Sequence, residues 1–250
     1  MKGTLALRGI AALVLLALWE GAARSGLFYQ GVLPPVPLIA AALARLLADP
    51  AFWRHAGTTA FEVVCALLIG GTLGVACGIV VGGGRLLRRA YEPALHYLAP
   101  TPKIIFLPIL IALCGVGPGS KIAMGALSCF FPLALSVASG MAQINPVHLR
   151  VARGFGLSRA RTLRSVVMPS LVQPLVTGLR LGLGVAVIGC LLGEIKLSNR
   201  GLGFLAIQYY GQFRIPEMYA VLLVVFALAG LGNAAAGRLR PRGATAGASP

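Results

Sequence analysis

The sequence is poor in acidic side chains. Six of its 250 residues are Asp or Glu, 22 are Lys or Arg, and charged residues make up 11% of the chain. A soluble domain usually has about a quarter of its residues charged, so the composition excludes an ordinary soluble protein. The six acids are spread along the whole chain, without clustered histidines or a nucleophile beside a base. This excludes the common arrangements of an enzyme active site.

Clustered metal ligands, disulfide pairs and a phosphate-binding loop are also missing. The five cysteines and three histidines are scattered, without any CxxC spacing. Metal ligation needs clustered ligands, so we expect no metal and no cofactor. A P-loop (Gly, four residues, Gly-Lys-Ser/Thr) is absent, so the chain does not cradle nucleotide phosphates in that way. We interpret the cysteines as small buried apolar residues: Cys65, Cys77, Cys114, Cys129 and Cys190.

Apolar residues, in contrast, are abundant. They make up 58% of the chain, mean hydropathy is +0.86, and there are 33 glycines. This is typical of a membrane protein with several spans, in which small residues let helices approach closely. A helical span needs about 20 apolar residues, and the chain is therefore predicted to be all-α and polytopic. Five windows qualify: Leu5–Ala23, Thr59–Val81, Ile122–Ala142, Leu171–Leu192 and Met218–Ala235.

A sixth span is weaker. Ile104–Val116 is too short, and extending it back to about Leu95 includes His96, Pro100, Pro102 and Lys103. Polar groups at membrane depth persist only where protein or water satisfies them. We therefore expect a kinked helix that lines something polar, giving about six spans in all. His96 could belong to a pathway, but we favour a histidine satisfied by helix packing.

The positive charges indicate the orientation. Of the 22 Lys and Arg residues, Lys103 and Arg180 fall within spans, thirteen lie in one set of segments and seven in the other. Because cytoplasmic loops carry the excess of basic residues, both termini are predicted to be cytoplasmic. Gly21-Ala22-Ala23 after the first apolar stretch resembles a signal-peptide cleavage site; we favour an uncleaved first span. Nucleic acid is not needed to explain the charge.

We divide the chain into three regions: residues 1–57, a first span and an outer interfacial segment; 58–240, a core of five spans; and 241–250, a disordered tail. Within the outer segment, Leu38–Leu47 is predicted to form a short amphipathic helix.

Glycines recur every fourth residue in the second span, at Gly70, Gly74, Gly78 and Gly82, and again at Gly178 and Gly182. This spacing favours close helix packing over the alternative of a smooth pore wall.

The longest inner loop, residues 143–169, suggests a knob made of two helices. A short helix starts near Pro146 and ends at Gly154 to Gly156, since glycine can take the left-handed conformation of a helix end. Ser158 can cap a second helix. Such a knob suits docking into a groove of a partner; the alternative is a merely basic loop that obeys the topology rule.

This loop resembles the EAA loop of binding-protein-dependent ABC importer permeases. That pattern is Glu-Ala-Ala, three residues, Gly, nine residues, an aliphatic residue, any residue, Leu-Pro. The matching positions are Arg150, Val151, Ala152, Gly156, Val166, Met168 and Pro169. The glycine, the spacing and the proline agree, whereas Arg150 stands where the family has glutamate. The departure puts in doubt any ion pair of that glutamate.

The resemblance extends along nearly the whole chain. Trp19-Glu20-Gly21-Ala22-Ala23-Arg24-Ser25-Gly26-Leu27, followed by Leu33-Pro34-Pro35, is similar to the amino-terminal signature of the nitrate, sulfonate and taurine subfamily. Further similarities are Pro100-Thr101-Pro102-Lys103, Asn145-Pro146, Thr177 to Gly182, Gly193-Glu194 and Gly201-Leu202-Gly203.

The resemblance implies a type I importer permease with the MetI-like fold in a bacterial inner membrane, and not an enzyme. Two ATPase subunits would bind ATP, a periplasmic binding protein would deliver substrate, and a second permease copy would complete the pathway in the bilayer. It implies a small anion as substrate: an alkanesulfonate, taurine or nitrate. Permeases for a pyrimidine precursor of thiamine or for bicarbonate remain open, as does, outside the family, an ion-coupled secondary transporter.

Two groups of residues are predicted to carry this function. The ATPase-coupling loop comprises Arg150, Val151, Ala152, Arg153, Gly156, Arg159, Arg161 and Pro169. Lys103, Arg180 and Glu194 are candidates for the translocation pathway, although we favour a carboxylate of another helix as the partner of Arg180. Glu20 and Glu62 lie near span ends, where we expect water, and are assigned no chemistry.

Overall fold

The computed structural model describes residues 2–26 and 31–238, and this part of the chain is helical and without strands. The α-helices are α1 (Lys2–Arg24), α2 (Val36–Ala48), α3 (Pro50–Gly82), α4 (Arg85–Leu98), α5 (Leu107–Cys114), α6 (Pro118–Ala142), α7 (Pro146–Gly154), α8 (Arg159–Thr162), α9 (Met168–Leu197), α10 (Leu202–Gly211) and α11 (Ile215–Arg238). A 3-10 turn, η1 (Lys103–Phe106), and a π-helical turn, η2 (Leu163–Val167), lie between them. The predicted tail, residues 241–250, lies outside the described residues.

Five helical stretches are long and apolar enough to cross a membrane, which confirms the five predicted windows. They are Ala6–Arg24, Pro50–Gly82, Pro118–Ala142, Ala160–Lys196 and Ile215–Arg238. At 33 residues, α3 is about 50 Å long. It therefore exceeds the hydrocarbon thickness of a bilayer, about 30 Å.

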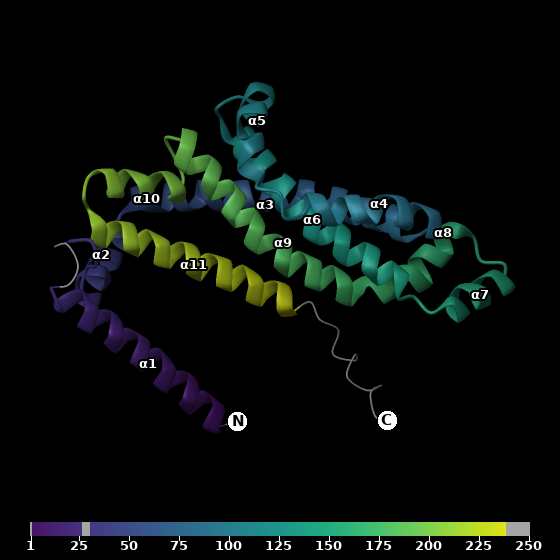
Figure 1. The fold of residues 1–250 in the computed structure, drawn as a ribbon, viewed down its shortest axis with the longest axis horizontal. Coiled ribbons are helices and arrows are strands. Elements are labelled where there is room, and N and C mark those ends of the chain that lie inside the picture. Colours follow the sequence, from purple (N-terminus) through teal and green to yellow (C-terminus); the bar gives the residue numbers. More distant parts are fainter. Residues whose placement is uncertain (1, 27–30, 239–250) are drawn as a thin grey trace.

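The predicted sixth span is broken rather than kinked. Helix α4 and the η1–α5 segment meet at 91° across a break of four residues or fewer. Pro100 and Pro102 lie in this break; proline removes a backbone donor and disfavours helix at the residue before it. As a result, α5 projects from the side of the bundle (Figure 1).

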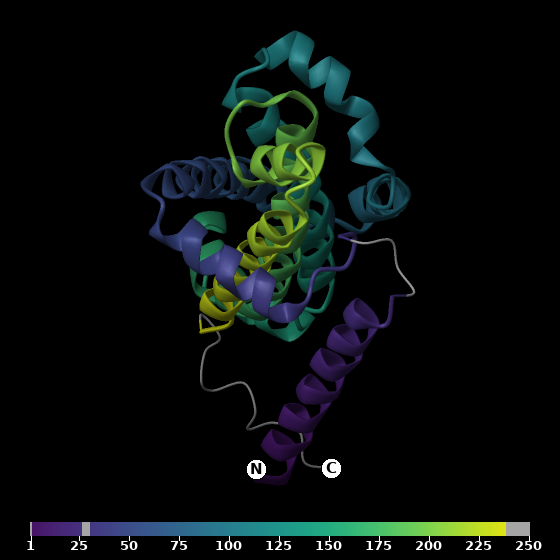
Figure 2. The ribbon, with the colours of Figure 1, turned by 90° about the vertical axis from the view of Figure 1, so that its left-hand side faces the viewer.

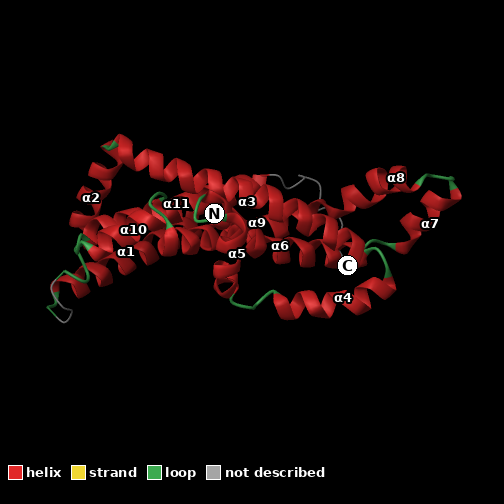
Figure 3. Cartoon of the chain, turned by 90° about the horizontal axis from the view of Figure 1, so that it is seen from above, coloured by secondary structure: helices red, strands yellow, loops and turns green. Residues whose placement is uncertain are grey.

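Helices α3, α6 and α9 form the centre of the bundle, where each packs against the other two (Figures 1 and 3). A Cβ atom added at Gly74 would lie 2.6 Å from the Phe130 carbonyl oxygen, and one at Gly78 would lie 2.6 Å from that of Ala134. Gly70 and Gly82 meet the α6 backbone in the same way. The prediction that this glycine row packs against a helix is thus confirmed.

Glycines of α9 approach an adjacent face of α6 as well. A Cβ atom at Gly178 of α9 would lie 3.0 Å from Ser136 Cβ and 3.2 Å from Leu133 Cα. Gly182, one turn later, meets the Leu133 side chain. Glycines of both α3 and α9 therefore let these helices approach α6 closely, and Leu133 of α6 contacts glycines of both.

The bundle has two distinct ends (Figure 1). At one end, which we call the α10 end, α2, α10 and the starts of α3 and α11 pack around a shared apolar cluster. Its fully buried members are Ala42, Leu202, Ala220 and Val221. At the opposite end, α7 and α8 extend beyond the other helices.

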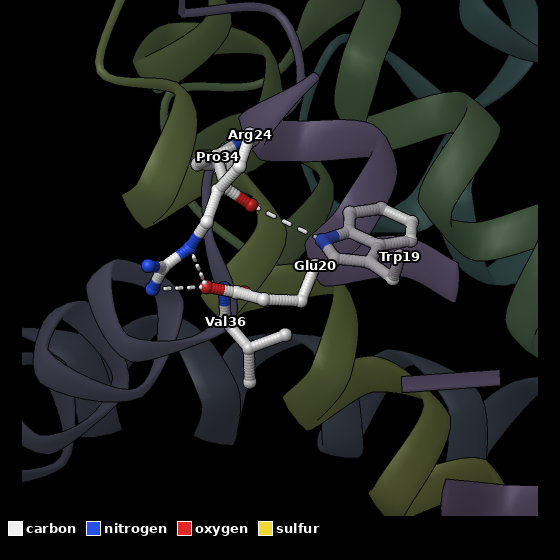
Figure 4. Close-up of polar contacts among 5 residues, drawn as sticks. All are labelled: Trp19, Glu20, Arg24, Pro34 and Val36. Atoms are coloured by element: carbon white, nitrogen blue, oxygen red, sulfur yellow. Dashed lines mark hydrogen bonds and ion pairs between the residues drawn. The ribbon is translucent and has the colours of Figure 1, made fainter. Parts of the chain in front are cut away.

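Helix α1 stands apart from most of the bundle and contacts it near α2, where the Trp19 ring also packs edge-on against Tyr219 of α11 (Figure 2). There the Trp19 indole N–H donates to the Pro34 carbonyl oxygen at 3.1 Å, and the Val36 N–H donates to Glu20 Oε2 at 2.8 Å (Figure 4). Arg24 donates to Glu20 Oε1 at 2.6 Å. Glu20 therefore has a structural role that the sequence did not indicate, since a carboxylate at a helix start satisfies a free N–H group.

Candidate functional site

The knob, residues 143–169, begins with a helix whose first turn is capped by its own sequence. Asn145 Oδ1 accepts the Val147 N–H at 2.9 Å, and Pro146 occupies the first helical position, where no donor is needed. Ile144 and Leu149 pack into a cluster with Val167 and Leu171 of the returning chain. These contacts fix the base of α7 to the start of α9.

Gly156 ends α7 as predicted. Its φ is +66°, the Leu157 N–H donates to the Ala152 carbonyl at 3.0 Å, and the Gly156 N–H donates to the Arg153 carbonyl at 2.9 Å. This pair of bonds is the Schellman motif, which satisfies the last carbonyls of a helix and reverses the chain. Because the space around a Cβ at Gly156 is open, the backbone angle and not crowding calls for glycine here.

The second half of the knob differs from the prediction. Ser158 Oγ accepts the Arg161 N–H at 3.3 Å, so the predicted cap is present. The helix does not end as a separate unit, however: α8 continues through η2 into α9. Pro169 lacks the N–H that would bond four residues back, and the wider π-helical turn lies just before it.

The exposed face of α7 is more apolar than the sequence analysis recognised. Val147, Val151 and Phe155, spaced four residues apart, are exposed by 46%, 50% and 80%. Arg150 and Arg153 are exposed beside them, whereas Ala152 is buried. A pocket of about 360 Å³ lies between this face and residues 165–170. The knob thus presents an apolar ridge and a hollow flanked by positive charge.

Arg180 lies on α9, but its predicted partner is wrong. Its Nε donates to Asn233 Oδ1 of α11 at 2.7 Å, and the side chain is exposed. An amide accepts the bond instead of a carboxylate. None of the ion pairs in residues 2–26 and 31–238 includes Arg180, and the neighbouring stretch of α11 carries no acid.

Lys103 lies in the break between α4 and α5. Its ammonium group donates to the Ala99 carbonyl and stands 5.0 Å from the centre of the Phe131 ring. A carbonyl and an aromatic face together solvate a cation without neutralising it. The structure brings neither Arg180 nor Glu194 to Lys103, so the three candidate pathway residues do not form one cluster within the chain.

Glu194 is completely buried at the α10 end. Thr59 Oγ1 of α3 donates to Glu194 Oε1 at 2.7 Å, and the Gly203 N–H of α10 donates to Glu194 Oε2 at 2.6 Å. Gly201, with φ of +105°, passes so close to this carboxyl group that a Cβ atom would collide with it. Glu194 therefore fastens α10 to α3 and α9.

Glu62 was expected near water, and that expectation is wrong. Its side chain is 1% exposed because α6 and α9 cover this stretch of α3. Lys121 of α6, 3% exposed, lies in the same region and donates to the carbonyls of Val116 and Gly117 at 2.5 and 2.9 Å. The four-residue glycine spacing of α3 indicated which face is covered but not that this face includes an acid.

The histidines and cysteines lie in different surroundings. His55 accepts the Gly201 N–H at 3.1 Å and stacks on Phe204, a contact that no sequence pattern indicated. His96 does not pack inside: its side chain is 63% exposed and 4.0 Å from Glu92. Cys114 is exposed, unlike the buried Cys129 and Cys190, because α5 projects from the bundle. All five thiols are free.

The profile of a family described as the inner membrane component of binding-protein-dependent transport systems matches residues 70–242. The chain belongs to this family. The match covers the central helices and the knob, and it confirms the resemblance on which the sequence analysis relied.

Relatives of this permease cover most of its length. It is 30% identical over 220 residues to the taurine transport system permease protein TauC of Escherichia coli strain K12, covering 86% of this chain and 80% of the relative. It is 25% identical over 217 residues to the putative aliphatic sulfonates transport permease protein SsuC of Bacillus subtilis strain 168, covering 87% and 78%. The nitrate import permease protein NrtB of a Synechocystis strain is 26% identical over 61% of this chain and 56% of its own.

The fold of the permease is similar to that of a chain in the inward-facing MetNI methionine ABC transporter. For the native crystal form of that transporter, the TM-score is 0.60 and the sequence identity is 21%. The match covers 81% of this chain and 94% of the MetNI chain. A selenomethionine-soaked form gives 0.62 at 22% identity, with 79% and 95% covered. This likeness confirms the all-α, MetI-like fold.

The permease is therefore a multi-pass inner-membrane protein of the ABC importer class, of the sulfonate, taurine and nitrate type. It is not itself an enzyme, since in this family the ATPase is a separate subunit. The assignment also explains why the sequence combines high hydropathy with no phosphate-binding loop.

Proposed function

We propose that this chain is the transmembrane subunit of an ATP-driven importer that moves a small anion, an alkanesulfonate, taurine or nitrate, from a periplasmic binding protein into the cytoplasm. The observation that carries the proposal is the 30% identity to the taurine permease over 86% of the chain. Arg180 and Lys103, two cations at membrane depth without an acidic partner in the described chain, are consistent with an anionic substrate.

The knob is proposed to dock in a groove of the ATPase. Its apolar ridge, Val147, Val151 and Phe155, is exposed on one face of α7, and an amphipathic helix of this kind binds by laying that face into a hydrophobic groove. The Schellman turn and the continuous helix from α8 to α9 make the knob rigid. When the ATPase closes, the knob and α9 would thus move together as one rigid body.

The proposed orientation places the knob and both termini in the cytoplasm. In support, α1 runs toward the α2 end of the molecule and α11 runs away from it, so both helices have their free ends directed toward the knob's side (Figure 1). The α10 end would then face the periplasm and receive the binding protein. Two ATPase copies and a second copy of this chain complete the proposed assembly, with ATP bound by the ATPase.

A second substrate class is favoured by one observation. The formylaminopyrimidine transport permease protein ThiX of Halalkalibacterium halodurans is 27% identical over 91% of this chain and 90% of its own. That coverage exceeds the coverage by the taurine permease, so a pyrimidine remains the alternative substrate.

The test is uptake by intact cells. A strain lacking this permease should lose accumulation of labelled taurine, ethanesulfonate or nitrate and regain it from a plasmid copy. Loss of labelled aminopyrimidine uptake alone would instead support the second class. Unchanged uptake of all four compounds would contradict both. Calorimetry with the purified binding protein then identifies the ligand directly.

A further inference from the structure

Two buried carboxyl groups lie at the α10 end, and the chemistry between them goes beyond the candidate pathway role given to Glu194 alone. Glu62 of α3 is 1% exposed and Glu194 of α9 is fully buried. On α3, Glu62 lies one turn beyond Thr59, the residue whose hydroxyl group donates to Glu194 Oε1 at 2.7 Å, so the two acids occupy the same buried contact between α3 and α9. Acidic side chains are almost never fully buried unless they are paired with a compensating group, so the surroundings of each carboxyl group need an account.

The two carboxyl groups have different partners. Glu194 accepts one hydrogen bond on each oxygen, from Thr59 Oγ1 at 2.7 Å and from the Gly203 N–H at 2.6 Å. Such donors stabilise an ionised carboxylate. Glu62 differs, because its Oε2 atom is buried and accepts no hydrogen bond from the described part of the chain. Glu194 is therefore the group that is built to carry the negative charge.

One buried basic side chain lies near the pair, and a single positive charge cannot neutralise two carboxylates. Lys121 of α6 is the buried cation, and its ammonium group donates to the carbonyls of Val116 and Gly117. The His55 imidazole is neutral, because its Nδ1 accepts the Gly201 N–H. The Cys190 thiol, buried one turn before Glu194 on α9, cannot add positive charge.

If both carboxyl groups were ionised, two buried negative charges would face one buried positive charge, that of Lys121, because Arg200 on the adjoining pocket is exposed to solvent. An unpaired buried charge costs several kcal/mol. Two carboxylates also cannot hydrogen-bond to each other, because an ionised carboxyl group only accepts. Both problems are removed by a single proton on the pair.

We propose that Glu62 and Glu194 bind one proton between them, with Glu62 as the neutral acid that donates to the Glu194 carboxylate. The proton comes from water when the pair is buried and returns to water when the pair is exposed. Its route is the adjoining pocket of about 450 Å³, whose lining includes Glu62, Lys121 and the exposed Arg200.

This proton is linked to the packing of α10. Thr59 Oγ1, which donates to Glu194, also accepts the Leu202 N–H at 2.8 Å, so the first turn of α10 is bonded to both α3 and α9 through the same groups. The packed arrangement holds one proton more than an arrangement with the pair in water. By linkage, it is favoured as pH falls and weakened as pH rises.

Infrared spectroscopy of the purified full-length chain in detergent tests the proposal, because a protonated carboxyl group absorbs at higher frequency than a carboxylate. With six acidic residues in total, the spectrum is simple. Labelling with ¹³C-glutamate separates the band from lipid or detergent esters. At neutral pH we expect one protonated-acid band in the native chain and its loss in Glu62→Gln. The matched control, Glu217→Gln, keeps the band, since Glu217 is ion-paired with Arg214 and Arg45.

Thermal unfolding supplies a second readout. In Glu62→Gln the amide N–H takes the place of the acid proton, so the variant should fold, and its unfolding temperature should depend less on pH than that of the native chain. Absence of the band from the native chain at neutral pH would overturn the proposal. So would a band that persists in Glu62→Gln, or stability that responds to sodium concentration and not to pH, which would indicate a bound metal cation instead.

Discussion

At the scale of single residues, the backbone angle of Gly156 is the feature of the knob that a substitution can test most selectively. Gly154 and Gly156 are two residues apart, and both have open space around a Cβ atom. They differ in that Gly156 has φ of +66°, whereas Gly154 is helical. A β-branched residue is strained at positive φ and is tolerated in a helix.

Gly156→Val should therefore reduce ATP-dependent uptake about tenfold or more, since strain of about 1–3 kcal/mol at the α7 turn displaces the docking face. Gly154→Val, the matched control, should retain most of the uptake. Both variants should appear in the membrane in native amounts on immunoblots. Normal uptake by Gly156→Val would contradict the assignment of the knob as the coupling element.

The residue scale is also where sequence reasoning reached its limits. Asn145, Gly156 and Ser158 act through bonds to near neighbours, so their roles could be predicted from the local sequence. The partner of Arg180 and the burial of Glu62 depend on which helices lie opposite, and the local sequence does not contain that information. Arg150, which stands where the family has glutamate, is exposed beside the apolar ridge and takes part in no ion pair in the described part of the chain.

At the scale of elements, the contact of α3 with α6 depends on small residues and not on side-chain interdigitation. Because the glycines of α3 have no Cβ atom, the α6 carbonyl groups of Phe130, Ala134 and Ala138 come closer to α3 than a Cβ atom would allow. In a bilayer, lipid tails are as apolar as leucine, so close backbone packing contributes much of the association of helices.

Gly74→Val should accordingly separate α3 from α6, because the added Cβ would lie 2.6 Å from a backbone oxygen that cannot move away. We expect destabilisation of about 1–3 kcal/mol or more, measured as a lower unfolding temperature in detergent. Gly230→Val in α11 is the control, since no atom lies within 4 Å of its Cβ position. Equal unfolding temperatures for the two variants would show that the α3–α6 contact tolerates side chains.

The elements themselves were largely predictable, for a physical reason. Apolar windows and four-residue glycine spacing are local patterns that a membrane converts directly into spans and packing faces. The prolines near residue 100 predicted an interruption, but its angle of 91° depends on the way α4 and α5 each pack against α6. The second knob helix was predicted as separate, and the π-helical turn that joins it to α9 left no sequence signal beyond Pro169.

At the scale of the whole molecule, the excess of basic residues has more than one cause. Under the proposed orientation, with both termini in the cytoplasm, most of the net charge of +16 belongs to segments on the cytoplasmic side of the membrane. Part of it lies on the knob around the apolar ridge, and two cations lie at membrane depth. Of the six acidic residues, two are not on the surface: Glu62 and Glu194 are both buried at the α10 end.

The central claim is that the chain transports substrate only when an ATPase drives it through the knob. The most direct test is reconstitution of the permease in liposomes with its ATPase and binding protein, followed by measurement of labelled substrate uptake. We predict uptake that requires ATP, the ATPase and the binding protein, and that is abolished by a non-hydrolysable ATP analogue. Uptake by the permease alone, driven by an ion gradient without the ATPase, would contradict the account.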